Sequence, residues 1–260
     1  MFINLFKKMK SNHHFAIFFL LSFNVFNHSD AQLKAKQVTI RPQSWIGLNG
    51  TMRLSDKWGV FYDANYRTNQ FFQSTLYTAS NIGVNYWFNE NTTFLLGYAH
   101  QWTAPTTAGW HTYANENRLY QQVLISSTFG KIAITNRFRN EERWQQAIIH
   151  DTATNSYVFS DRVRYYVSAV IQLAKKPYLP SIIVSDEIYL QMGSAIVYNT
   201  FDQNRAFIGL RESISKDLVF DIGYMVIDQE KSTGYQYDRD HLFRLYFHYY
   251  PDFRPKKGGM

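Results

Sequence analysis

The chain has 260 residues and a formal net charge of +7; 45% of its residues are hydrophobic and 18% are aromatic. This length suits one large domain or two small ones, and the apolar content excludes a disordered chain. The absence of cysteine excludes disulfides, thiolate zinc sites and cysteine nucleophiles. The mean hydropathy is −0.34, and the chain beyond its N-terminal region has no apolar stretch of roughly 18 residues, which excludes a bundle of membrane-spanning helices.

The N-terminal segment has the pattern of a secretion signal. Three lysines precede the apolar run 15–26, and a small-residue cleavage site follows at 29–31. A membrane anchor is the alternative, but the run is short for one and is interrupted by polar residues. We therefore predict a cleaved signal peptide at 1–31 and a single mature domain at 32–260. The mature net charge falls to +5 because three lysines and one aspartate are lost, and we expect no nucleic acid partner.

The mature chain alternates polar and apolar residues with a period of two, which is the pattern of β-strands. No convincing amphipathic helix longer than two turns interrupts the pattern. Most of the predicted strands reach the roughly 9–11 residues that a tilted strand needs to cross a bilayer. They are 43–54, 58–70, 75–88, 92–104, 116–128, 131–144, 160–174, 179–191, 202–215, 217–229 and 239–250.

The connections between these strands alternate in length. Tight turns are predicted at 55–57, 89–91, 129–131, 175–177 and 215–217, and longer loops at 105–115, 145–159, 192–201 and 230–238. Short turns at one end and long loops at the other are typical of bacterial outer-membrane barrels. We therefore expect the tight turns and the N-terminus in the periplasm and the long loops outside the cell.

The fold class predicted is all-β, a single antiparallel transmembrane β-barrel. Eleven strands can be counted, whereas single-chain bacterial barrels have even numbers. Residues 33–41 could supply a short twelfth strand, and ten strands would result if one weak candidate were not a span. We predict about twelve strands, a number that leaves a narrow lumen which side chains could largely fill.

Charged residues mark one face of the predicted strands. In 132–143, Arg137, Arg139, Glu141 and Arg143 share a face opposite Ile134 and Phe138. A charge facing hydrocarbon at mid-depth costs about 2–4 kcal/mol for Arg or Lys, so the charged face is predicted to line the lumen. The predicted lumen-lining residues are Asp63, Arg67, Arg118, Arg137, Arg139, Glu141, Arg143, Arg162, Arg164, Glu187, Arg205 and Arg244. The soluble alternative is a β-sandwich, but a dry sandwich core would not accept so many arginines.

Several motifs resemble an uncharacterised family of exported Bacteroidetes proteins, catalogued as domain of unknown function 2490. They are NEERWQ at 140–145, DRVRYY at 161–166, DEIYLQ at 186–191, FDQNR at 201–205 and GYMVIDQ at 223–229. The resemblance covers nearly the whole mature chain, and the pair DEIYLQ and FDQNR is its most specific part. It implies an outer-membrane β-barrel with no established activity. One departure is that ten residues follow Tyr250, whereas outer-membrane barrels often end on an aromatic residue.

For function, the lumenal arginines allow two interpretations. They could favour small anionic solutes in a narrow pore, or they could brace a closed barrel through arginine–carboxylate pairs. We expect a monomer in the outer membrane of a Gram-negative bacterium, surrounded by outer-membrane lipid, with no cofactor, no metal site and no catalytic residue.

Two other functions stay open. One is a barrel enzyme acting on lipid or envelope glycan, in which a serine or carboxylate would lie about 2.6–3.2 Å from a histidine such as His100, His241 or His248. The candidate serines are Ser126, Ser127, Ser168 and Ser185, and none has a motif around it that marks a nucleophile. The other is a soluble periplasmic β-protein that binds a ligand.

Overall fold

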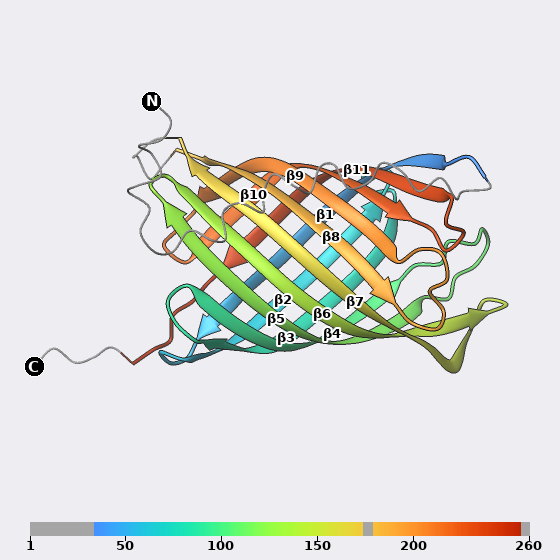
Figure 1. The fold of residues 1–260 in the computed structure, drawn as a ribbon, viewed down its shortest axis with the longest axis horizontal. Coiled ribbons are helices and arrows are strands. Elements are labelled where there is room, and N and C mark those ends of the chain that lie inside the picture. The colour runs from blue at the N-terminus through green and yellow to red at the C-terminus, as the bar shows by residue number, and fades with distance from the viewer. Residues whose placement is uncertain (1–33, 174–178, 256–260) are drawn as a thin grey trace, which may run out of the picture. The chain divides into compact units, whose positions relative to one another are not determined.

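The protein is a closed barrel of β-strands (Figure 1). The computed structural model describes residues 34–173 and 179–255; the predicted signal peptide at 1–31 lies outside them. The eleven strands are β1 (Gln37–Arg53), β2 (Trp58–Asn69), β3 (Ser74–Trp87), β4 (Thr92–Thr103), β5 (Ala114–Phe129), β6 (Ile132–Ile149), β7 (Thr152–Gln172), β8 (Ser181–Met192), β9 (Phe201–Ser213), β10 (Leu218–Glu230) and β11 (Gln236–Tyr249). In the described part of the chain, no helix is long and apolar enough to span a membrane.

Each strand pairs with its neighbours in chain order, and β1 closes the barrel against β11. All the hairpin pairs are antiparallel, but β1 and β11 run parallel, in register from Gln37 opposite Gln236 to Asn49 opposite His248. The all-β barrel prediction is confirmed. The expected twelve strands are wrong, because residues 37–41 are the beginning of β1 rather than a separate strand.

The parallel closure also corrects the predicted position of the N-terminal end. β1 begins beside the start of β11, at the end of the barrel that carries the loops β8–β9 and β10–β11. The C-terminal end of β11 lies with the tight turns, where Arg53 bridges to Asp252. An odd number of strands requires this arrangement, since the first and last strands then point the same way. The start of β1 therefore lies opposite the tight turns, not among them.

The predicted loop 145–159 is instead a long hairpin that projects past the neighbouring strands (Figure 1). Its two-residue turn, His150 and Asp151, has φ values of 49° and 56°, the left-handed conformation that such hairpins need. Asp151 Oδ1 accepts backbone N–H groups from His111 (2.9 Å) and Thr112 (2.7 Å). The hairpin tip thus fastens the β4–β5 loop next to the start of β5.

Side chains alternate between the barrel interior and its outer wall. One apolar cluster inside the barrel contains Trp45, Phe207 and Leu242 from β1, β9 and β11, and a second contains Leu95 and Tyr120. The outer wall carries exposed apolar side chains from strand after strand, among them Ile46, Ile82, Leu96, Phe138, Ile208 and Phe243. Compared with a soluble protein, the barrel has an apolar outside, but its inside is not wholly polar, because the interior contains both charged and apolar side chains.

Candidate functional site

The interior of the barrel contains the largest group of charged side chains. By side-chain alternation, all twelve residues of the predicted lumen set occupy inward-facing strand positions. Most of them form ion pairs with one another or with other inward acids, whereas Asp63 accepts hydrogen bonds from Asn65 and Asn81. Glu141, Arg162, Arg164 and Glu187 are buried to more than nine-tenths. Of the adjacent acids in DEIYLQ, Glu187 faces inward, whereas Asp186 faces outward and accepts a hydrogen bond from Asn204 at 3.0 Å.

The central network, which we call the Glu141 cluster, joins β6, β7, β8 and β9. Glu141, 1% exposed, accepts bonds from Arg162 Nη2 and Arg164 Nη1, both at 2.5 Å. Arg162 also reaches Asp202 (3.0 Å), and Arg164 reaches Glu187 (2.9 Å from Nε). The cluster comprises Arg137, Arg139, Glu141, Arg162, Arg164, Glu187 and Asp202. Charge-assisted, forked arginine bonds of this kind fix the strands relative to one another.

Two smaller networks lie nearer the two ends of the barrel, one toward the long loops and one toward the tight turns. In the first, Arg118 and Arg143 both donate to Glu116 Oε1 at 2.6 Å. In the second, Arg211 donates two bonds to the Asp221 carboxylate at 2.6 and 2.7 Å. Arg244 lies 3.5 Å from the same carboxylate. Each network contains two arginines and one acid, so both leave an excess of positive charge inside the barrel.

Two further arginines have aromatic rings rather than carboxylates as their main partners. Arg67 Cζ lies 3.4 Å from the Trp45 ring centroid and 4.2 Å from that of Tyr77. Arg205 Cζ lies 5.1 Å from the centroid of the same Trp45 ring and 4.5 Å from that of Tyr189. Among the described residues, neither guanidinium has a carboxylate within ion-pair distance. Arg205 also donates two bonds to Gln203 Oε1, both at 3.2 Å. Uncharged partners therefore hold both guanidiniums in place without neutralising them.

The middle of the interior is filled by side chains. Tyr120, Tyr189 and Leu242 are 0% exposed, and Glu141 is 1% exposed. These residues come from β5, β8, β11 and β6, on different sides of the barrel. A continuous water path beside them would give them exposure, so the geometry is that of a braced core rather than of an open channel.

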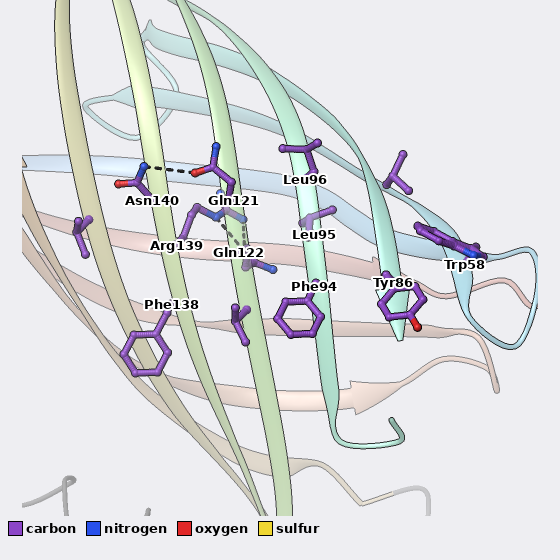
Figure 2. Close-up of a pocket in the computed structure, with 13 residues that line it drawn as sticks. Trp58, Tyr86, Phe94, Leu95, Leu96, Gln121, Gln122, Phe138, Arg139 and Asn140 are labelled. Atoms are coloured by element: carbon purple, nitrogen blue, oxygen red, sulfur yellow. Dashed lines mark hydrogen bonds between the residues drawn. The ribbon is translucent and has the colours of Figure 1, made fainter. Parts of the chain in front are cut away.

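One hollow, with a volume of about 780 Å³, lies on the outer wall and not inside the barrel. Figure 2 shows Phe138 toward one end of it, Tyr86 and Trp58 toward the other, and Phe94 between them. Gln121 and Asn140 bond to each other at 3.3 Å. The lining is otherwise mostly apolar and holds no nucleophile beside an acid or base, so the hollow is part of the apolar wall and not an active-site cleft.

The histidines in the described part of the chain do not form a catalytic triad. His248 Nε2 lies 3.0 Å from Asp221 Oδ2, the distance expected for an acid–base pair. However, its Nδ1 is occupied by Asn49 at 2.8 Å, and Arg211 already holds the Asp221 carboxylate. His100 bonds Asn117, and His241 bonds Tyr224. Within residues 34–173 and 179–255, no histidine bonds a serine hydroxyl, and no group of three His, Asp or Glu side chains could hold a metal.

Sequence reasoning missed two features of this interior. The His248–Asp221–Arg211 contact joins β11, β10 and β9, and only the period-two pattern of each strand, combined with their hairpin register, could have indicated it. The apolar cluster around Trp45 and Leu242 was also missed. A strand with one charged and one apolar face suggests a wholly polar lumen, but inward positions here alternate charge with large apolar groups.

The fold and interior together define a closed β-barrel with an apolar outer wall and a charged, internally paired core. The chain belongs to the family described as protein of unknown function (DUF2490), whose sequence profile matches residues 42–238. The match confirms the resemblance seen in the motifs. No curated protein is found to match the chain.

Proposed function

We propose that this protein is a monomeric outer-membrane β-barrel of a Gram-negative bacterium whose role is structural. The observation that carries the proposal is the belt of exposed apolar side chains around a closed barrel. Ile82, Leu96, Ile208 and Phe243 are 56–61% exposed and lie on β3, β4, β9 and β11. Soluble monomers rarely expose apolar patches beyond a few hundred Å². Contact with outer-membrane lipid would remove this cost.

Aromatic residues near the strand ends also support insertion in a bilayer. Trp58 and Phe88, at the tight-turn end, are 52% and 59% exposed, and the Trp58 ring packs against Tyr86 at 4.8 Å between centroids. Trp102, at the other end of the wall, is 41% exposed. Two such girdles are characteristic of outer-membrane barrels.

The test is fractionation of the cell envelope followed by electrophoresis with and without boiling. The proposal predicts that the protein is recovered in the outer-membrane fraction and that detergent is needed to extract it. It also predicts that the unboiled protein migrates faster on the gel, because the braced barrel stays folded. Recovery in the soluble periplasmic fraction would refute it and would favour a soluble ligand-binding β-protein.

A narrow anion-preferring pore is a second candidate, favoured by Arg67 and Arg205. Their positive charge lies inside the barrel with aromatic partners, and an excess of lumenal cations selects for anions. If the barrel conducts in planar bilayers, replacing both arginines with glutamine should reduce anion selectivity. Absence of conductance would refute the pore and leave the structural role as the remaining proposal. For the alternative of an enzyme acting on lipid or glycan, the described histidines offer no activated nucleophile, because none of them bonds a serine hydroxyl.

A further inference from the structure

A second hollow, of about 460 Å³, lies inside the barrel at its tight-turn end. We call it the vestibule. Its wall comes from the ends of β5 to β11 next to the turns, and includes Thr128, Gln172, Ser181, Arg211 and His248. Since the middle of the barrel is filled, the vestibule is a dead end. A hollow that leads nowhere is suited to binding rather than to passage.

The strand register places polar side chains in a row along this wall. On the inward face, Gln172 is opposite Ser181, Ser181 is opposite Arg211, and Arg211 is opposite Asp221. Directly opposed side chains in an antiparallel pair have Cβ atoms about 4.5–5.5 Å apart. A hydroxyl and an amide therefore lie within reach of any ligand that the Arg211 guanidinium binds.

The charge of the vestibule floor is positive. Arg211 uses Nε and Nη2 on Asp221, yet its side chain is still 32% exposed whereas that of Asp221 is 1% exposed. Arg244 shares the same carboxylate, so one acid faces two guanidiniums. Lys131 adds a cation at the rim. Glu212 also borders the hollow, from a position whose side chain alternation directs to the outer wall.

We propose that the vestibule binds a small oxyanion-bearing solute, with Arg211 as its main binding residue. The exposed part of a guanidinium that Asp221 already orients offers fixed N–H donors to a phosphate or carboxylate. Ser181 and Gln172 complete the contact from the adjoining strands. This site goes beyond the structural role proposed above and depends on the folded barrel, not on the compartment in which it resides.

The absence of cysteine from the chain allows a clean test. Ser181→Cys is a nearly isosteric change that places one thiol opposite Arg211. We would measure its modification rates in the purified, detergent-solubilised protein with an anionic and a cationic methanethiosulfonate, each relative to its rate with a free thiol. One unpaired unit charge at cross-strand distance should favour the anionic reagent by about threefold or more. We would then repeat the measurement with inorganic phosphate or acetate added at constant ionic strength. The anion that slows modification of the thiol shows whether the site prefers a phosphate or a carboxylate.

The matched variants are Arg211→Gln and Arg239→Gln in the same cysteine background. Arg239 forms the same forked pair with Asp228, at 2.6 and 3.0 Å, but on the outer wall. The proposal predicts that Arg211→Gln abolishes both the preference and the protection, while Arg239→Gln changes neither. Equal rates for the two reagents, or a preference that survives Arg211→Gln, would overturn it. Heat-modifiable mobility of each variant confirms that the barrel is folded, so a negative result bears on the site alone.

Discussion

The buried carboxylate of Glu141 is the most consequential group to remove. Glu141→Gln changes almost nothing in volume, but it leaves Arg162 and Arg164 facing a neutral amide in place of the anion that each contacts at 2.5 Å. Removing one partner of a buried ion pair costs about 3–5 kcal/mol because the remaining charge is uncompensated. Two guanidiniums lose a partner at once, but Arg162 keeps Asp202 and Arg164 keeps Glu187, so we expect a loss within that range.

The next residue provides a matched control. Glu142 lies on the outer face and accepts only a 3.4 Å bond from Gln121, so Glu142→Gln should change the free energy of unfolding by less than about 1 kcal/mol. Unfolding by guanidinium chloride from detergent, followed by tryptophan fluorescence, measures both. If Glu141→Gln fails to fold, Glu116→Gln should show a smaller loss in the same direction. Equal stabilities of Glu141→Gln and Glu142→Gln would refute the bracing argument.

Two further predictions concern the loop clamp and the interior packing. The backbone N–H groups of Thr112 and His111 hold the pKa of Asp151 below its usual range, so docking of the β4–β5 loop is stabilised above the ordinary carboxyl pKa and lost as the pH falls through the lowered one. The protection of the amides of residues 104–113 against hydrogen exchange, expressed relative to the intrinsic exchange rate at each pH, should therefore decrease at acid pH. This pH dependence should disappear in Asp151→Asn, because asparagine tolerates the left-handed backbone but carries no carboxylate. An unchanged pH dependence in that variant would contradict the proposed role of Asp151 in holding the loop. A Cβ on Gly97 would overlap the ring of fully buried Tyr120, so Gly97→Ala should destabilise the barrel by about 1–3 kcal/mol in the same unfolding assay. Wild-type stability of this variant would show that the ring can move.

The inward set could be predicted because strand alternation is a local property. Along 137–143, every second residue is charged. Placing those charges against lipid would cost more free energy than placing them in the barrel interior. The pairing of Arg162 with Asp202 could not be predicted in the same way. It depends on β7, β8 and β9 lying side by side with a specific register, which is a property of the closed barrel and not of any one strand.

The closure itself was mispredicted for a related reason. Residues 33–41 lack a strong alternating pattern, so nothing local shows whether they form a new strand or extend the next one. The hairpin at His150 and Asp151 was missed because neither residue is glycine or asparagine, the usual residues of a two-residue turn. Its left-handed turn is supported by a contact with Thr112, nearly forty positions away along the chain.

The parallel pairing of β1 with β11 has a practical consequence for experiments on this barrel. The start of β1 and the end of β11 lie at opposite rims, so a tag placed before β1 and a tag placed after β11 would join the barrel at opposite ends. The same geometry prevents simple circular permutation, because a linker joining the two ends would have to run the full height of the wall. In an antiparallel barrel with an even number of strands, a short turn would be enough.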